Sequence, residues 1–155
     1  MRAVVILLMS ALVAACAGSG EPRERDRFEE MAVYERHAGG AESWVRYTSI
    51  RNWWAVGFNS VVFEMGRSRF YLVELIGACD LDLDSAMTLK VVSGRRNVIG
   101  EFDDVIVNGR TCQVQSIRRL DYEAVKAELE DEGESLPNKH DNVDVETQDA
   151  SSGGT

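Results

Sequence analysis

The sequence has little proline, little histidine and no long hydrophobic run. Two of its 155 residues are proline and two are histidine. The scarcity of proline excludes collagen-like and proline-rich chains. No apolar run reaches the roughly 18 residues that a membrane-spanning helix needs, and no internal repeat indicates a solenoid. The apolar content of 45% fits one small folded domain.

The first fifteen residues have the pattern of a secretory signal peptide. Arg2 supplies a positive charge, Ala3–Val13 an apolar segment, and small residues precede Cys16. The run Val13-Ala14-Ala15-Cys16 resembles the lipobox of bacterial lipoproteins, in which the cysteine thiolate takes up a diacylglycerol. This resemblance implies that Cys16 is the lipidated mature N-terminus and anchors the chain to a membrane. The alternative is an ordinary signal peptide with a chance cysteine.

The residue after the lipobox indicates to which membrane the lipoprotein would be sorted. Ala17 stands where an aspartate would be the usual signal for retention at the inner membrane. We therefore expect a cell-envelope protein, anchored by lipid to the outer membrane and facing the periplasm.

Basic residues are fewer than acidic ones. The chain holds 17 basic and 26 acidic residues, for a net charge of −9, and Lys139 is the single basic residue within 131–155. Such a chain does not attract nucleic-acid phosphates over long range, so we expect no nucleic-acid partner. Local arginine pairs leave open a patch for an anionic glycan or phospholipid headgroup; they are Arg67/Arg69, Arg95/Arg96 and Arg118/Arg119.

Cysteine is also scarce, with three in the chain. Once Cys16 carries lipid, Cys79 and Cys112 remain as an even pair in an oxidising compartment. Their spacing is not Cys-x-x-Cys, and no histidine lies near either of them in sequence. We therefore predict one structural disulfide rather than a redox pair or a metal site.

Alternating apolar patterns predict a mainly β domain. Five short segments are rich in aromatic and β-branched residues: Glu42–Tyr47, Trp53–Gly57, Ser60–Glu64, Phe70–Leu75 and Met87–Val92. Asn108-Gly109 then predicts a hairpin with a type I′ turn that pairs Val107 with Arg110 and Val105 with Cys112. We expect a small antiparallel sheet, or a partly open barrel or sandwich, with one C-terminal helix.

That helix is predicted to begin after an N-cap at Asp121, to bury Tyr122, Val125 and Leu129, and to end at Gly133. These signals divide the chain into a signal peptide (1–15), a lipid-anchored tether (16–40), the β-rich domain (41–131) and an acidic disordered tail (132–155). The tether contains a short helix at Arg27–His37, with Phe28, Met31 and Ala32 on one face.

Candidate metal ligands occur in Asp80-Leu-Asp-Leu-Asp84. Alternate aspartates Asp80, Asp82 and Asp84 could supply oxygens to calcium. An EF-hand loop beginning at Asp80 requires glycine and glutamate where the chain has Ser85 and Val91, so the pattern is not an EF-hand. A solvated turn is the alternative, and no cofactor is predicted.

No catalytic residue is assigned from the sequence. His37 and His140 lie outside the predicted domain, which makes a Ser-His-Asp or Cys-His site hard to build there. Two-carboxylate hydrolysis remains open for Glu64, Glu74, Glu101, Asp103 and Asp104. Trp44, Trp53 and Trp54 could stack on sugars, but we expect two of them to pack in the core.

The chain also resembles a family of short, uncharacterised proteobacterial envelope proteins that often carry lipoprotein signals. The resemblance covers residues 34–125. It is carried by Tyr34–His37 with Ala38-Gly39, Trp53/Trp54, Arg69–Leu75, Cys79, Phe102–Val107, Cys112 and Ile117–Leu120. Because that family has a domain of unknown function, it implies no catalytic residue.

Together these patterns predict a non-catalytic, lipid-anchored binding module with an envelope protein or glycan as partner. The alternatives are a carboxylate-based envelope hydrolase and a small-ligand or calcium-binding module.

Overall fold

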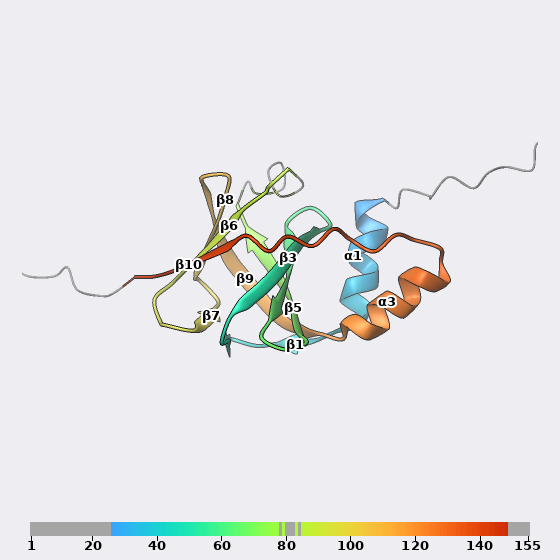
Figure 1. The fold of residues 1–155 in the computed structure, drawn as a ribbon, viewed down its shortest axis with the longest axis horizontal. Helices are drawn as coiled ribbons and strands as arrows, with labels where there is room; N and C mark the ends of the chain where they lie inside the picture. Colours follow the sequence, from blue (N-terminus) through green and yellow to red (C-terminus); the bar gives the residue numbers. More distant parts are fainter. Residues whose placement is uncertain (1–25, 78, 80–82, 84, 149–155) are drawn as a thin grey trace, which may run out of the picture.

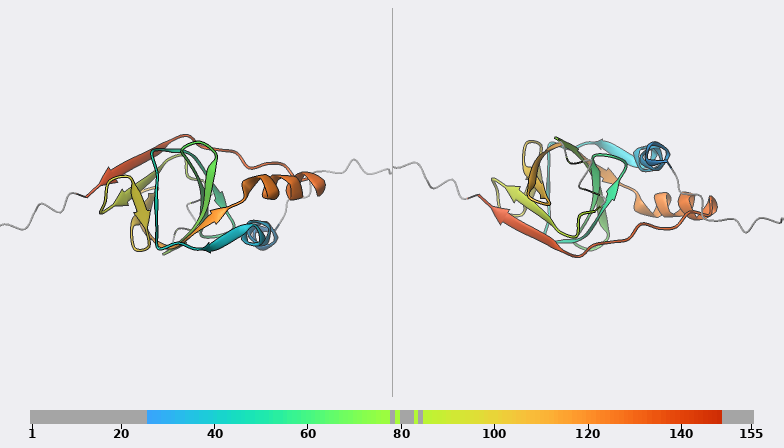
Figure 2. Two further views of the ribbon diagram at one scale, coloured as in Figure 1. Left: turned by 90° about the horizontal axis from the view of Figure 1, so that it is seen from below. Right: turned by 90° about the horizontal axis from the view of Figure 1, so that it is seen from above.

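Strands dominate the computed structural model, which describes residues 26–77, 79, 83 and 85–148 (Figure 1). Within these residues, one large curled sheet forms a half-barrel, and a small second sheet and the helices α1 and α3 accompany it. The predicted mainly β class with a C-terminal helix is therefore confirmed. Both helices lie at one end of the half-barrel (Figure 2).

The large sheet has the strand order β10-β6-β8-β9-β5-β4-β3, with β1 paired to β9, and β2 pairs with β7 in the small sheet. The strands are β1 (Ala38–Ala41), β2 (Trp44–Arg46), β3 (Ile50–Val56), β4 (Ser60–Met65), β5 (Arg69–Ile76), β6 (Leu89–Ser93), β7 (Val98–Gly100), β8 (Asp104–Val107), β9 (Arg110–Leu120) and β10 (Val143–Thr147).

The β8–β9 hairpin has the predicted register. Val107 lies opposite Arg110 and Val105 opposite Cys112. Asn108 and Gly109 have φ angles of 49° and 82°, as both central residues of a type I′ turn require. The turn therefore fixes which residues of β9 face the interior.

A C-terminal strap, residues 135–148, joins the two edges of the half-barrel. His140 exchanges two backbone hydrogen bonds of 2.9 Å with Trp53 on β3, and β10 pairs in parallel with β6. Figure 1 shows the strap running from the end of α3 (Tyr122–Asp131) across the molecule to β10. The prediction that residues 132–155 are a disordered tail is therefore wrong for this segment. Backbone pairing with exposed sheet edges holds a chain that has too few apolar side chains to form a core of its own.

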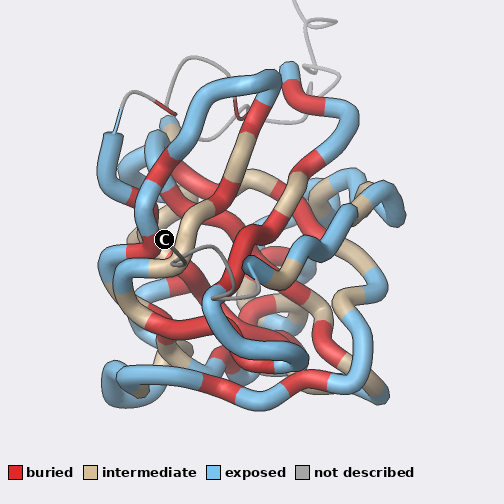
Figure 3. Tube along the Cα trace, turned by 90° about the vertical axis from the view of Figure 1, so that its left-hand side faces the viewer, coloured by how far each residue is buried: buried red, intermediate tan, exposed pale blue. Residues whose placement is uncertain are grey.

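The sheet buries side chains on both of its faces. The inner core lies on its concave side, and Figure 3 shows buried positions alternating with exposed ones along several strands. The outer core lies between the opposite face and the helices. Its buried residues are Val33, Tyr34, Trp54, Val56, Val62, Phe70, Leu72, Leu120, Tyr122, Val125 and Leu129.

Helix α1 (Arg27–Arg36) belongs to this fold rather than to a tether. It buries Val33 and Tyr34 in the outer core, and β1, which follows it, pairs with β9. The predicted tether is therefore wrong in this part, and the predicted helix face is right only in part. Met31 packs against the outer core as predicted, whereas Phe28 is largely exposed and packs on Phe58, at 4.7 Å between ring centroids.

Helix α3 follows its prediction closely. The Asp121 side chain caps it by accepting a hydrogen bond from the Ala124 backbone N–H at 3.2 Å. Tyr122, Val125 and Leu129 are buried, and Gly133 follows the helix with a φ of 73°. The cap and the apolar spacing together place the first turn of α3 against the outer face of the sheet.

Candidate functional site

An aromatic cage, formed by Trp54, Phe70 and Tyr122, stands on the outer face of the sheet. Ring centroids lie 4.6 Å apart for Phe70 and Tyr122, 5.0 Å for Trp54 and Tyr122, and 6.1 Å for Trp54 and Phe70. The rings are tilted against one another by 38–58°, a preferred arrangement for aromatic pairs. A hydrogen bond also holds the Trp54 ring in place, because its Nε1 donates to the buried Tyr34 hydroxyl at 3.2 Å.

Strand register brings the cage together with a carboxylate. Asn52, Glu64, Phe70 and Leu120 are direct neighbours in one row across β3, β4, β5 and β9. Since side chains two positions apart share a face of a strand, Trp54 stands on the same face as Asn52. Glu64 Oε2 accepts a hydrogen bond from Asn52 Nδ2 at 2.8 Å, which orients the carboxylate beside the rings.

The cage holds the ammonium group of Lys139 from the strap. Lys139 Nζ lies 5.1, 5.3 and 4.9 Å from the ring centroids of Trp54, Phe70 and Tyr122. Each distance is within the roughly 6 Å over which an aromatic face attracts a cation. Glu64 Oε2 is 3.4 Å from Nζ and completes the site with an ion pair. Burial, together with the nearby Glu64 and Glu123 carboxylates, raises the pKa of Tyr122, so its ring stays neutral.

A pocket of about 450 Å³ adjoins the cage and shares Phe70 and Tyr122 with it. Its other lining residues come from the cap of α1, β1, the β4–β5 turn, the end of β9 and the start of α3. They are His37, Gly39, Ser68, Arg119, Leu120, Asp121 and Glu123. Two aromatic residues, a histidine and two acidic residues of α3 and its cap thus border one hollow.

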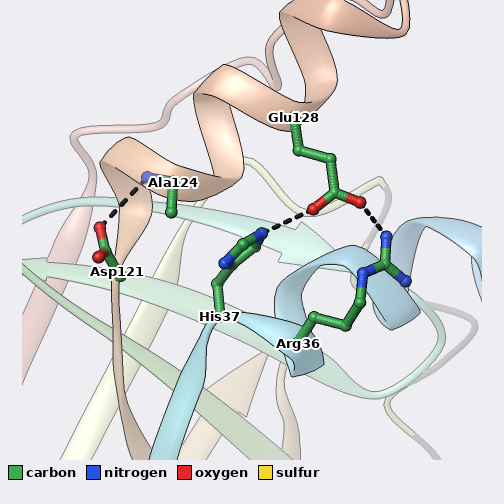
Figure 4. A network of polar contacts seen from close by, with 5 residues as sticks. All are labelled: Arg36, His37, Asp121, Ala124 and Glu128. Atoms are coloured by element: carbon green, nitrogen blue, oxygen red, sulfur yellow. Dashed lines mark hydrogen bonds and ion pairs between the residues drawn. The ribbon is translucent and has the colours of Figure 1, made fainter.

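His37 at the edge of this pocket belongs to a polar network between the two helices (Figure 4). His37 Nε2 donates to Glu128 Oε2 at 2.6 Å, and Arg36 forms an ion pair with the other carboxylate oxygen. Hydrogen bonds from Arg36 and His37 lower the pKa of Glu128. The prediction that the histidines lie outside the domain is wrong, because α1 and the strap pack onto the sheet.

His37 is not positioned as a general base that would activate a nucleophile. Ser68 borders the same pocket, but among the described residues no hydrogen bond joins its hydroxyl to His37. The Nε2 of His37 is directed at Glu128, which ties α1 to α3. The arrangement as a whole can bind a cation and enclose an adjoining group.

The predicted disulfide is confirmed. Cys79 and Cys112 are bonded to each other, with 6.2 Å between their Cα atoms, and both are buried in the inner core. Cys112 faces inward because the hairpin register places it opposite Val105. Cys16 and the candidate metal ligands Asp80, Asp82 and Asp84 lie outside the described residues, so the predictions of lipidation and calcium binding stay predictions.

The five carboxylates considered for hydrolysis are not collected at the pocket. Glu74 forms an ion pair with Arg118 on β9. Asp103 accepts hydrogen bonds from Ser93 Oγ at 2.9 Å and from the Gly100 N–H at 2.8 Å, which tie the ends of β6 and β7 to the segment before β8. Glu64 serves the cage, and neither it nor Glu74, Glu101, Asp103 or Asp104 lines the pocket.

Two of the three tryptophans are core residues, as predicted. Trp53 and Trp54 are buried, whereas Trp44 is 47% exposed. The guanidinium carbons of Arg46 and Arg95 each lie 5.7 Å from the Trp44 ring centroid. Trp54 nevertheless has a second role that the sequence did not suggest, as a wall of the cage.

Sequence reasoning missed Lys139 and the partners that surround it. The one available signal was a single lysine in an otherwise acidic tail. Its importance follows from the tertiary fold, since residues 54, 64, 70, 122 and 139 come from β3, β4, β5, α3 and the strap.

Comparison with known proteins gives a family without an assigned activity. Residues 1–135 match a family of unknown function, DUF6491. The chain belongs to this family. No similar protein was found among curated proteins or among solved structures.

The matched region of the DUF6491 family ends before Lys139 and so contains the cage walls but not the lysine. Within the described part of the chain, no helix is long and apolar enough to cross a membrane. No group of three or more histidine, cysteine, aspartate or glutamate side chains is placed to hold a metal ion among residues 26–77, 79, 83 and 85–148.

Proposed function

We propose that this DUF6491 protein is a non-catalytic binding module, anchored by lipid on Cys16 to the periplasmic face of the outer membrane. The ligand site is the aromatic cage with its adjoining pocket. The observation that carries the proposal is the occupied cage, in which three rings and one carboxylate lie around an ammonium group. A pocket of about 450 Å³ beside it offers room for further contacts.

Two further observations support export and anchoring. A disulfide between Cys79 and Cys112 is typical of proteins outside the reducing cytoplasm. The lipobox-like run Val13–Cys16 precedes the folded part, and the family match extends over it. The chain from Cys16 to Asp26 then provides a short connection between a lipid and the sheet.

Hydrolysis by paired carboxylates is less well supported. Glu64, Glu74 and Asp103 each have a partner within the fold: Lys139, Arg118 and the Gly100 N–H, respectively. A general acid and its companion carboxylate need a shared cleft in which water and a glycosidic bond fit between them. The pocket is instead bordered by a different set of side chains.

Membrane fractionation tests the anchor. The wild-type protein is expected in the outer-membrane fraction, and Cys16→Ser, which removes the thiol that accepts lipid, is expected to leave that fraction. Cys112→Ser serves as the matched control, because it removes a sulfur atom of the Cys79–Cys112 disulfide and leaves Cys16, the proposed lipid acceptor, intact. Wild-type protein that is soluble after cell lysis contradicts the anchor.

Crosslinking in intact envelopes tests the binding role. The wild-type protein is expected to capture a defined envelope component, and Glu123→Gln at the pocket is expected to reduce that capture. Glu130→Gln is the matched control, since this exposed glutamate of the same helix removes the same charge away from the pocket. Equal capture by both variants, or recovery of non-specific proteins alone, contradicts a binding site at this pocket.

A further inference from the structure

The cage walls are built independently of the lysine that fills them. Trp54 is on the edge strand β3, Phe70 is on the inner strand β5, and Tyr122 is held in place by the first turn of α3. With Lys139 in place, Trp54 is 1% exposed and Tyr122 is 3% exposed. Withdrawal of the lysine would therefore uncover a preformed site rather than dismantle it.

The carboxylate in the cage favours a cation. The Glu64 side chain is 14% exposed, and its other partner is the neutral amide of Asn52. A partly desolvated carboxylate beside three aromatic faces is stabilised by a positive group, because both the charge and the ring quadrupoles attract it. A neutral ligand of the same shape gains neither attraction.

The present occupant is tethered and partly exposed. The Lys139 side chain is 36% exposed, unlike the walls around it. It is held by its neighbour His140, whose ring stacks on Trp53 at 4.8 Å between centroids and whose backbone bonds to β3. A tethered group competes with free ligands at an effective concentration set by its linker, on the order of millimolar for short flexible linkers.

The pocket shows where the remainder of a ligand would lie. It shares Phe70 and Tyr122 with the cage, so a molecule whose cationic end enters the cage can extend into the pocket. Ser68 and Glu123 are among the polar residues that line it. Quaternary ammonium groups are a typical occupant of aromatic cages in proteins.

We propose that the aromatic cage with Glu64 is a binding site for the alkylammonium group of a small organic cation, and that Lys139 occupies it as an internal competitor. This inference rests on the proposed function and deepens it by giving the chemical class of the ligand. The strap then acts as an occluding segment that a stronger cation displaces from the cage.

Choline titration of the full-length protein in dodecyl maltoside tests this inference. Intrinsic tryptophan fluorescence reports on the cage through Trp54. Lys139→Ala is expected to bind choline about tenfold or more tightly than the wild type, because the tethered competitor is gone. The matched control is Lys126→Ala, whose ammonium lies 5.7 Å from the Tyr122 centroid but pairs with Glu123 outside the cage; its affinity is expected to equal that of the wild type.

A neutral ligand and a second variant separate cation binding from apolar binding. The neutral isostere 3,3-dimethyl-1-butanol is expected not to bind to Lys139→Ala. Adding Glu64→Gln to that variant is expected to weaken choline binding by about tenfold, the loss of one charge-assisted contact. Equal binding of choline and its neutral isostere overturns the proposal.

The folding of the variants is followed by circular dichroism and thermal melting. If Lys139→Ala does not fold, Lys139→Gln, which keeps a long side chain without the charge, replaces it in the same titration. A folded variant of either kind that binds choline no more tightly than the wild type overturns the proposal. The membrane anchor is read out separately by fractionation, so its failure and the failure of the cage are distinguishable.

Vesicles distinguish a lipid headgroup from a soluble cation. A fluorescence change of Lys139→Ala with phosphatidylcholine vesicles, but not with phosphatidylglycerol vesicles, indicates that the cage takes a choline headgroup. A change with free choline alone indicates a soluble ligand. No change with either source overturns the proposal.

Discussion

At the scale of single residues, the hydrogen bond between Trp54 and Tyr34 is predicted to stabilise the folded protein. Tyr34→Phe removes the acceptor of the Trp54 Nε1–H in the buried outer core. Leaving that donor without a partner is expected to lower the free energy of unfolding by about 1–3 kcal/mol. Denaturant unfolding measures the change.

Tyr47 supplies the matched control for that experiment. Its hydroxyl oxygen is buried and has no hydrogen-bond partner among the described residues. Burial and the Asp103 carboxylate raise the pKa of Tyr47, so the group is neutral at ordinary pH. Tyr47→Phe is therefore expected to be neutral or stabilising, and equal losses from both substitutions contradict this account of the Tyr34 bond.

The ion pairs of Glu128 are predicted to make the stability of the fold depend on pH. Because Arg36 and His37 lower its pKa in the folded protein, folding is favoured while this carboxylate is ionised. That stabilisation is fully present above the usual pKa of a glutamate and is lost as the pH falls through the lowered value. Glu128→Gln is expected to be less stable than the wild type at pH 7, with a difference that shrinks toward acid.

Thermal melting at several pH values measures that difference. Glu130→Gln is the control, since this exposed glutamate of α3 has no ion-pair partner among the described residues. A Glu128→Gln variant whose deficit stays constant down to strongly acidic pH contradicts the assigned ion pairs. The deficit should also decrease at high salt, because the site is partly exposed.

At the scale of elements, the strap is predicted to stabilise the half-barrel by covering both of its edges. A chain ending after Asn138 lacks Lys139, the Trp53–His140 pairing and β10. It leaves the edges of β3 and β6 unpaired and is expected to melt at a lower temperature and to self-associate more readily. Melting and light scattering measure both effects.

A shorter truncation isolates the contribution of β10. A chain ending after Asp141 keeps Lys139 and His140 but loses the pairing with β6. Its melting temperature is expected to lie between those of the wild type and of the longer truncation. A longer truncation that melts like the wild type contradicts the role of the strap.

The elements differ in how far the sequence alone predicted them. The β8–β9 hairpin and α3 were predicted correctly because a local turn pair, Asn108-Gly109, and a local cap, Asp121, determine them. The strap was missed because β10 pairs with a strand about fifty residues away and offers exposed side chains in place of an apolar face. The composition of such a segment predicts disorder, even where backbone pairing with a sheet edge gives it a defined structure.

The same distinction applies to the candidate site. The Cys79–Cys112 bond follows from the count of cysteines and the expected compartment, and it is confirmed. The cage depends on which residues the register of β3, β4 and β5 places in one row, and no short motif records that. Lys139 then reaches the cage only because the strap crosses β3 beside Trp53.

At the scale of the whole molecule, two cores lie on opposite faces of one sheet and have different structural roles. The inner core is closed by a disulfide and holds the half-barrel together. The outer core, which the helices cover, carries the cage at its edge. This division allows the cage to exchange its occupant while the inner core remains intact.

The central claim is that this chain is an exported module held on a membrane by its first mature cysteine. Intact mass spectrometry of the protein purified from membranes tests it most directly. The account predicts a polypeptide that begins at Cys16, carries the added mass of its acyl chains, and lacks the two hydrogens lost when Cys79 and Cys112 join. An unprocessed chain that begins at Met1, without lipid and with three reduced thiols, contradicts it.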